Sequence, residues 1–409
     1  MSSFQRKGYN PSLLKLELLS KGLRVSPEVQ DAFGKSLKEV LRVRTGAGCG
    51  VDLILENEVF VIAHTEELFS ANSPFTLEMA DNKYFIAKNG EYVQKVRLLP
   101  RPQFYDMKTS DGIPMREIGA VQGDFVSFSL DNRCWFWGMY QGENLKKYRG
   151  LECKFCSIGL NWDGERKERP VKSIDQILEV CEEALKQKYV NHIGLNAGTY
   201  PPPGRGHQEY ADVVRAIKEN FDVWIRMAIA PPEEEKYVDL LYEAGADIVG
   251  YNLEVFDPEL FAYICPGKLK EIDKGVAHSH YEKILKHASR VAGRDHVFSN
   301  LITGTEPRES TVKGIEYLCS LGVLPRVFVG NFQKGTPLEN KPVSSTEDLV
   351  YIYRNLKRIV QDEYHEDVGC PGCARIEVNT KEFLGVNPKM VPITDDDLLR
   401  AGIDPAATY

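Results

Sequence analysis

The feature that most constrains the fold is a regular alternation of short β-branched runs with amphipathic helical patterns, which begins near residue 124. The runs predicted as strands are Asp124–Leu130, Asn191–Leu195, Val223–Met227, Asp247–Asn252, Val297–Ile302 and Arg326–Gly330. The helical patterns between and after them are Ser173–Gln187, Gln208–Asn220, Glu233–Ala244, His280–Ala292, Ser310–Leu321 and Thr346–Asp362. Six β/α units in one row predict an α/β fold with a parallel sheet and helices outside, and therefore a partial (β/α)6 TIM-like barrel.

A different pattern precedes this alternation and predicts a small α+β domain. Its expected elements are helices at Ser12–Ser20 and Pro27–Val43, strands at Val51–Leu55 and Val59–Ala63, and a hairpin of Tyr84–Ala87 with Tyr92–Val96. The hairpin is indicated by Asn89-Gly90, a favoured two-residue turn. The two prolines in 99–106 predict an extended linker after the hairpin.

These patterns divide the chain into three parts. We expect an N-terminal α+β cap over residues 1–115, the partial barrel over 116–365, and a C-terminal extension with a Cys-x-x-Cys pair over 366–409. A chain of 409 residues is long enough for one large domain and a smaller one.

Composition and charge narrow the class of protein. The chain has nine cysteines, an odd number that is too sparse for a secreted disulfide scaffold, so we expect a reducing, cytoplasmic setting. The first residues lack the apolar stretch of a signal peptide, and no run approaches the length of a membrane span. The net charge is −8 with acidic and basic residues well mixed, which favours a small-molecule substrate over nucleic acid.

The strongest chemical signal is Cys153-Lys154-Phe155-Cys156, with Cys134 upstream. A soft metal or iron–sulfur centre requires thiolates, and Cys-x-x-Cys lets two neighbouring thiolates face one centre. The cysteines follow the first predicted strand, at the edge where (β/α) barrels build their active sites. Three thiolates can hold three corners of a four-iron cluster and leave the fourth iron open for chemistry.

Four more motifs lie at the ends of later predicted strands. They are Asn196-Ala197-Gly198-Thr199, Tyr251-Asn252-Leu253-Glu254, Leu301-Ile302-Thr303-Gly304-Thr305-Glu306 and Gly335-Thr336-Pro337-Leu338-Glu339. With the cysteines and Phe155, their order resembles the radical S-adenosylmethionine (SAM) superfamily over roughly residues 124–340, and the barrel is most similar to biotin and lipoyl synthases. One departure is the eighteen residues between Cys134 and Cys153, where three are usual, so this loop must fold back to the cluster.

The resemblance implies cofactors and roles for particular residues. A [4Fe-4S] cluster on Cys134, Cys153 and Cys156 would chelate SAM, and reductive cleavage would give a 5′-deoxyadenosyl radical that abstracts hydrogen from a small molecule. An electron donor is then required, either a reductase or a flavodoxin- or ferredoxin-type protein. The implied SAM contacts are Phe155 and Ile302 at the adenine, Ala197, Gly198 and Thr199 at the methionine amino group, and Asn252 and Glu254 at the ribose hydroxyls.

The remaining cysteines leave alternatives open. Cys370 and Cys373, joined by Cys49, are candidate ligands of an auxiliary cluster, which would make sulfur insertion the expected reaction. Rearrangement, C–C bond formation and methyl transfer are the alternatives within the superfamily. The competing class is a (β/α) protein without radical chemistry, in which Cys153, Cys156 and the tail pair hold structural zinc. Cys265 is read as a ligand, a substrate contact or a plain loop cysteine, and Cys181 and Cys319 as core residues.

Overall fold

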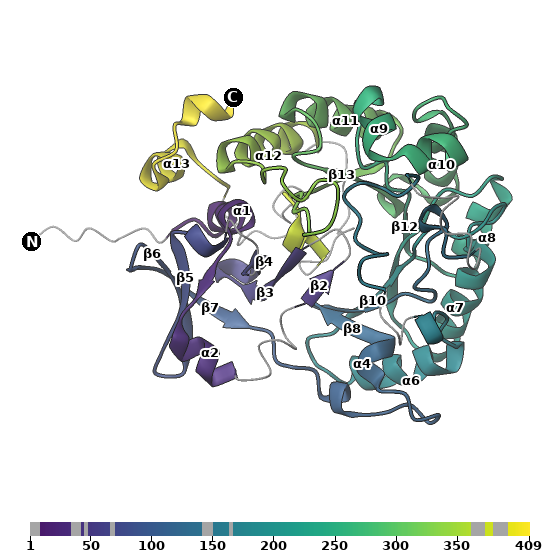
Figure 1. The fold of residues 1–409 in the computed structure, drawn as a ribbon, viewed down its shortest axis with the longest axis horizontal. Helices are drawn as coiled ribbons and strands as arrows, with labels where there is room; N and C mark the ends of the chain where they lie inside the picture. Colours follow the sequence, from purple (N-terminus) through teal and green to yellow (C-terminus); the bar gives the residue numbers. More distant parts are fainter. Residues whose placement is uncertain are drawn as a thin grey trace, which may run out of the picture.

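The computed structural model describes residues 9–33, 42–44, 48–65, 70–140, 150–162, 167–360, 373–378 and 392–409. Two mixed regions of structure lie side by side in Figure 1, an N-terminal sheet with α1 and α2 on one side and a larger sheet with its helices on the other. No described helix combines the length and the apolar character needed to cross a membrane.

The larger sheet carries the predicted β/α units. Its strands are β8 (Gly119–Gln122), β9 (Phe125–Phe128), β10 (His192–Asn196), β11 (Trp224–Ala228), β12 (Ile248–Gly250), β13 (Val297–Ile302) and β14 (Leu324–Phe328). They pair in chain order, and all neighbours from β9 to β14 are parallel. Consecutive parallel neighbours with right-handed connections place every helix on one face, so the sheet curls with its helices outside. The partial barrel is therefore confirmed.

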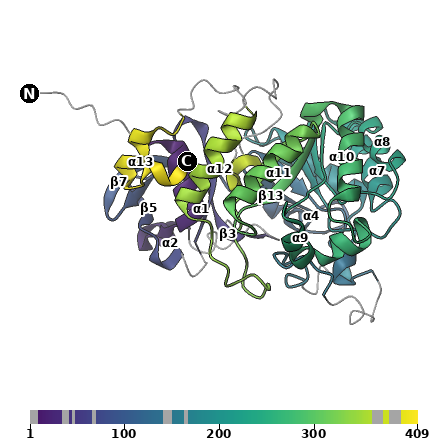
Figure 2. The same ribbon diagram turned by 90° about the horizontal axis from the view of Figure 1, so that it is seen from above.

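The helices that cover this sheet form its outer layer in both ribbon views (Figures 1 and 2). They are α6 (Ile174–Leu185), α7 (His207–Asn220), α8 (Lys236–Glu243), α9 (Pro258–Ile264), α10 (Ser279–Ala292), α11 (Arg308–Ser320) and α12 (Thr346–Val360). Sequence patterns missed α9, the single π-helical turn Lys268–Ile272 that follows it, and the antiparallel β8. The sixth strand also begins two residues before its predicted start, at Leu324.

The N-terminal sheet contains β1 (Arg24–Val25), β2 (Arg42–Arg44), β3 (Gly48–Ile54), β4 (Phe60–His64), β5 (Phe75–Ala80), β6 (Lys83–Lys88) and β7 (Glu91–Leu98). Helices α1 (Pro11–Lys21) and α2 (Pro27–Phe33) accompany it, whereas the short α4 (Met115–Ile118) packs against α6 and β8 of the larger sheet. The hairpin is confirmed, since Lys88 pairs with Glu91 and both turn residues have positive φ. The helix predicted over Pro27–Val43 was wrong at its end, where Arg42–Arg44 pairs with β3 instead. The linker was wrong after Pro102, because Gln103–Asp106 forms a 3-10 turn.

A distant segment protects the open edge of the barrel at β14. Backbone hydrogen bonds join Val329 N to Ile376 O and Val378 N to Val327 O, so residues 376–378 run antiparallel along β14. The same segment is bound to the N-terminal region, because buried Lys15 of α1 donates to Ala374 O at 2.8 Å. An edge strand covered in this way offers no free ladder to another chain.

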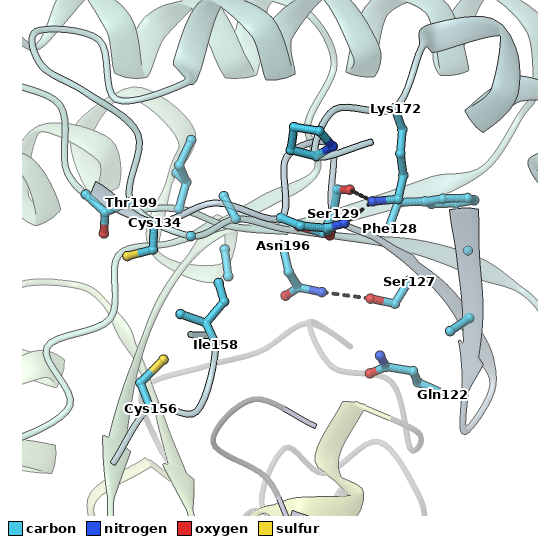
Figure 3. A pocket seen from close by; sticks show the side chains of 18 of the residues that line it. Gln122, Ser127, Phe128, Ser129, Cys134, Cys156, Ile158, Lys172, Asn196 and Thr199 are labelled. Carbon is cyan, nitrogen blue, oxygen red and sulfur yellow. Dashed lines mark hydrogen bonds between the residues drawn. The ribbon is translucent and has the colours of Figure 1, made fainter. Parts of the chain in front are cut away.

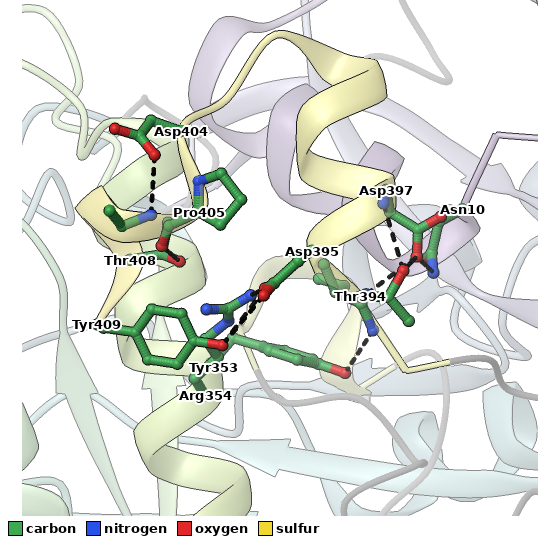
Figure 4. Close-up of polar contacts among 12 residues, drawn as sticks. Asn10, Tyr353, Arg354, Thr394, Asp395, Asp397, Asp404, Pro405, Thr408 and Tyr409 are labelled. Carbon is green, nitrogen blue, oxygen red and sulfur yellow. Dashed lines mark hydrogen bonds and ion pairs between the residues drawn. The ribbon is translucent and has the colours of Figure 1, made fainter.

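Polar contacts also join the C-terminal helix α13 (Asp395–Ala401) to its surroundings (Figure 4). Asn10 Nδ2, just before α1, donates to Asp397 at 3.0 Å, and Arg354 of α12 pairs with Asp395. Helices α1 and α12 are themselves in contact. The N- and C-terminal elements thus pack together beside the barrel, while the domain limits at 115 and 365 stay a prediction.

A buried histidine in the outer layer predicts acid sensitivity. His207, the first residue of α7, donates from Nδ1 to Gly204 O at 2.7 Å and accepts from the Tyr251 hydroxyl at 3.2 Å. Burial lowers the pKa of His207 from 6.5 to about 3. The unfolded chain therefore binds a proton that the folded chain rejects. This contribution to stability is complete above pH 6.5 and is lost as the pH falls toward 3.

We expect the free energy of unfolding to fall by about 2 kcal/mol more in the wild type than in a His207→Gln variant between roughly pH 6.5 and pH 4.5. Urea unfolding at the two pH values measures the difference. Because carboxylates elsewhere titrate equally in both proteins, equal losses would contradict a neutral buried His207.

Candidate functional site

One large cavity of about 1310 Å³ is lined by residues of the curled sheet and of the segments that follow its strands. Its lining includes Cys134, Cys153 and Cys156, the ends of β10 and β13, and the residues Asn252 and Glu254 just after β12, and Figure 3 shows side chains of β9 and β10 beside two of the cysteines. No described residue before Arg101 lines the cavity, so the N-terminal sheet does not form its wall.

Cys134 is held against the end of β10. Trp135 N donates to Thr199 O at 2.6 Å, and a Cβ on Gly198 would lie 2.3 Å from Arg133 O. Only glycine permits this approach of two backbones. The short turn Trp135–Trp137 then returns the chain toward Cys-x-x-Cys, where Trp137 covers Gly159. The distant cysteine is thus brought to the cavity, as the long first spacing requires.

The Cys-x-x-Cys turn is bound to the segment after α9. Cys156 N donates to Cys153 O at 2.9 Å within the turn. Lys154 N donates to Ile264 O at 2.9 Å, and Gly267 N donates to Leu151 O at 3.0 Å. A Cβ on Gly267 would lie 2.3 Å from that same Leu151 O. Residues 264–267 therefore fix the backbone that carries both thiols.

The three thiols differ in acidity. Burial raises the pKa of Cys134, and burial together with the neighbouring thiols Cys153 and Cys134 raises that of Cys156. The pKa of Cys153 is lowered, first by the adjacent Cys265 side chain and then by the charge of Lys268. Cys153 is therefore the thiol whose surroundings most favour the thiolate.

Cys265 is the cysteine that sequence reasoning left undecided. It ends α9, is fully buried, and its side chain contacts Cys153, which together with burial raises its own pKa. It does not line the cavity. Cys265 therefore lies beside Cys153 but outside the cavity lining. Cys181 and Cys319 are buried on α6 and α11, as predicted.

The predicted methionine contacts line the same cavity beside Cys134. Ala197 N donates to Ala228 O at 3.2 Å, which continues the pairing of β10 with β11. Ala197, Gly198 and Thr199 form a strip of backbone along the wall. Asn196 Nδ2 donates to Ser127 Oγ at 2.8 Å (Figure 3).

The predicted ribose contacts are organised around a lysine that sequence reasoning missed. Lys268 Nζ donates to Asn252 O at 2.8 Å and to Glu254 Oε1 at 2.9 Å, and both charged side chains are about nine-tenths buried. Burial alone would lower the pKa of Lys268, but the negative Glu254 outweighs it, so the pKa lies above 10.5. No local pattern marks Lys268, because its partner Glu254 lies fourteen residues earlier, in the segment after β12.

Glu254 has a backbone conformation that few residues adopt. Its φ is +73°, and its backbone bonds to both Asn300 O and Ile302 N. Residues with such backbone angles are found where the surrounding contacts hold the strained conformation in place, and they are frequent at functional sites. The Asn252 Oδ1 atom beside it is buried without a hydrogen-bond partner among the described residues. An acceptor of this kind fits a hydroxyl donor such as a ribose.

The adenine contacts inferred from the sequence also reach this cavity. Phe155 and Ile302 both line it and are mostly buried. Glu306, the last residue of the same motif, instead accepts from Phe256 N and Asp257 N. That carboxylate therefore joins the loops after β12 and β13.

The tail pair is described only in part. Cys370 lies outside the described residues, while the backbone of Cys373 begins the turn Cys373–Ile376 and that of Cys49 belongs to β3. The two elements are in contact through Arg375 and Asp52, whose Nε and Oδ1 atoms lie 3.1 Å apart. Arg375 and Ile376 line the cavity.

The thiols of Cys134, Cys153 and Cys156 do not form a binding site for a single metal ion. Among the described residues, no three His, Cys, Asp or Glu side chains lie close enough to hold one metal ion. A four-iron cluster places each thiolate on a different iron, so its ligands lie further apart than those of one zinc ion. Cys134, Cys153 and Cys156 all line the same cavity.

The close contact at Gly198 gives a prediction for the site. Gly198→Ala should displace the Cys134 backbone, because the new Cβ would overlap Arg133 O, and bound iron after reconstitution should fall by more than half. Gly204→Ala is the matched control, since its Cβ would meet only the Tyr237 ring, at 3.1 Å. Equal iron content in the two variants would show that Gly198 does not position Cys134.

The fold and the site together define a partial (β/α) barrel with three thiols on one cavity. Residues 150–323 match the family model described as the radical SAM superfamily, a range that contains Cys153, Cys156, Asn252, Glu254 and Ile302 but not Cys134. This part of the chain is a radical SAM domain. The specific likeness to biotin synthase is not supported.

Among curated proteins, the chain is similar to bacteriochlorophyllide c C-7(1)-hydroxylase of Chlorobaculum limnaeum. The two are 23% identical over 221 residues, which are 49% of this chain and 53% of the relative. The chain therefore spans about half the length of that relative.

Solved structures with similar folds share little sequence with the chain. Methylornithine synthase (PylB) is 17% identical with a TM-score of 0.41, over 56% of this chain and 61% of that one. Coproporphyrinogen III oxidase (HemN) from Escherichia coli is 16% identical with a TM-score of 0.33, over 44% and 42%. Streptococcus suis SuiB bound to the peptide SuiA is 16% identical with a TM-score of 0.37, over 52% and 43%.

Proposed function

We propose that Cys134, Cys153 and Cys156 hold a [4Fe-4S] cluster and that the enzyme generates a 5′-deoxyadenosyl radical which abstracts hydrogen from a small molecule. The observation that carries the proposal is the convergence of these three thiols, Asn252 and Glu254 on one cavity. When bound, the cluster and SAM supply the one-electron cleavage that releases methionine and the radical.

The chain's own residues bind and orient the cofactor. The lowered pKa of Cys153 supports it as the thiolate that engages metal first, and the segment 264–267 keeps its backbone in place. The backbone strip 197–199 suits the methionine amino group. The Asn252 Oδ1 atom and the Glu254 carboxylate suit the ribose hydroxyls, and Lys268 adds a buried positive charge beside them.

The reaction that follows hydrogen abstraction depends on the tail. If Cys370 and Cys373, with or without Cys49, hold a second cluster, sulfur insertion is the expected outcome. The contact between Arg375 and Asp52 supports Cys49 as a third ligand, because it joins the elements that carry Cys49 and Cys373. With one cluster only, the similarity to a hydroxylase favours hydroxylation, and rearrangement, C–C bond formation or methyl transfer are the other outcomes. We expect a cytoplasmic enzyme supplied by a reductase or a flavodoxin- or ferredoxin-type donor.

The test is to count iron, sulfide and zinc after anaerobic reconstitution, and then to measure 5′-deoxyadenosine released from SAM under dithionite. About four irons with release supports a single SAM-binding cluster, and about eight supports the second cluster. Stoichiometric zinc, little iron and no release would overturn the proposal in favour of a structural-zinc protein.

A further inference from the structure

A tryptophan near the three cavity thiols has a hydrogen-bond donor that the described residues leave unused. Trp137 lies three residues after Cys134 and lines the cavity. Its indole Nε1 atom is buried and has no hydrogen-bond partner among the described residues. A buried donor without an acceptor costs free energy, and a bound group that accepts from it removes that cost.

Backbone and ring contacts fix the position of this indole. Trp137 N donates to Cys134 O at 3.1 Å. A Cβ on Gly159 would lie 2.1 Å from Trp137 Cε3, so the six-membered ring lies directly on the backbone of Gly159. Gly159 follows Cys156 by three residues. Trp137 thus joins the chain at Cys134 to the chain just after Cys156, and the contact restricts the rotation of its ring.

The acceptor that this donor suits is the sulfur of Cys156. Burial raises the pKa of the Cys156 thiol most strongly, whereas the Trp137 side chain lowers it. A neutral side chain has this effect when it donates toward the charged form of the group, and Nε1–H is the only donor of an indole. A neutral thiol is a weak acceptor, but a thiolate accepts strongly. We therefore expect the bond to form when Cys156 loses its proton to bind iron.

We propose that Trp137 is a positioning residue for the iron–sulfur cluster: its Nε1–H donates to the Cys156 thiolate and raises the reduction potential of the cluster. This inference rests on the proposed function, because it concerns the cluster of that site. Hydrogen bonds to the sulfurs are among the factors that set the potentials of such clusters. A donor on the thiolate stabilises the reduced cluster more than the oxidised one, because reduction adds a negative charge. The cluster then accepts its electron from a weaker reductant.

The test compares the full-length, anaerobically reconstituted wild type with Trp137→Phe, which removes the N–H but keeps an aromatic ring on Gly159. A potentiometric titration followed by electron paramagnetic resonance gives the reduction potential of each protein. We expect Trp137→Phe to lower the equilibrium constant for reduction about tenfold, a shift of about 59 mV for one electron. Trp224→Phe is the matched control, because Trp224 begins β11 and does not line the cavity, and its potential should equal that of the wild type.

An unchanged potential in a Trp137→Phe protein that binds iron as the wild type does would overturn the inference, as would an equal shift in Trp224→Phe. If Trp137→Phe does not bind iron, pulsed paramagnetic resonance of the reduced wild type, labelled with ¹⁵N in its indole rings, decides. A ¹⁵N coupling that persists in a labelled Trp135→Phe protein supports the bond. No coupling, or a coupling lost in Trp135→Phe, overturns it.

Release of 5′-deoxyadenosine from SAM by the wild type is scored separately. A lowered potential in Trp137→Phe without release by the wild type removes the proposed function alone. Release by the wild type with an unchanged potential in Trp137→Phe removes this inference alone. A wild type that binds no iron removes both.

Discussion

Cys153→Ala and Cys156→Ala should each lower 5′-deoxyadenosine release by more than about a hundredfold, since changing only an outer partner of a metal ligand already costs 10- to 100-fold. Each variant removes one of the thiols that line the cavity. The barrel should stay folded, because the Cys-x-x-Cys turn is held by backbone hydrogen bonds that an alanine retains. Iron content, visible absorption and SAM cleavage after anaerobic reconstitution measure the effect.

Cys181→Ala is the matched control for this experiment. Cys181 is fully buried on α6 and does not line the cavity, so its loss removes a buried thiol without touching the site. We expect that variant to bind iron and cleave SAM as the wild type does. SAM cleavage by a folded Cys153→Ala or Cys156→Ala variant at the wild-type rate would sink the assignment of the cluster ligands.

Lys268→Met should destabilise the cluster-free protein by about 3–5 kcal/mol, because it leaves the buried Glu254 carboxylate without its cation. The same change should weaken SAM binding, since the variant loses the positive charge next to Asn252 and Glu254. Urea unfolding measures the first effect, and equilibrium dialysis of SAM on the reconstituted protein measures the second.

A double-mutant cycle separates the two effects. Adding Glu254→Gln to Lys268→Met should restore most of the stability, because no buried charge then remains unpaired, while SAM binding should stay weak. Lys274→Met is the surface control: Lys274 is 66% exposed and 3.5 Å from Glu233, and such pairs contribute at most about 1 kcal/mol. If Lys268→Met lowered the free energy of unfolding no more than Lys274→Met does, Lys268 and Glu254 would not be a buried pair in which each charge depends on the other.

The barrel could be predicted from sequence because its strands are buried on both faces and rich in apolar residues, as in Val297–Ile302, where every residue is buried and only Ser299 and Asn300 are polar. The elements that were missed depend on distant partners. The segment 376–378 is extended because it pairs with β14, some fifty residues earlier, and no local pattern marks it. The helix predicted through Val43 ended early because β3 offers Arg42–Arg44 a strand partner.

The candidate site also contains residues that local sequence patterns predicted and residues that they missed. Motifs at strand ends placed Gly198, Asn252 and Glu254 beside the cavity, because strand ends share one edge of a parallel sheet. Lys268 and Cys265 follow a helix that sequence reasoning did not predict, so nothing indicated that they would lie beside Glu254 and Cys153. The one available signal was Pro266-Gly267, which marks a turn where backbones can approach closely.

The pairing of residues 376–378 with β14 has a consequence for synthesis of the chain. β14 leaves the ribosome about fifty residues before the segment that covers it, so during that interval the barrel has a bare ladder edge and lacks the Arg375 side of its cavity. Uncovered strand edges of this kind attract other nascent chains and chaperones. Metal delivered in that interval would reach a cavity that still lacks this part of its wall. We therefore expect the cofactor to be inserted after residues 376–378 have paired with β14.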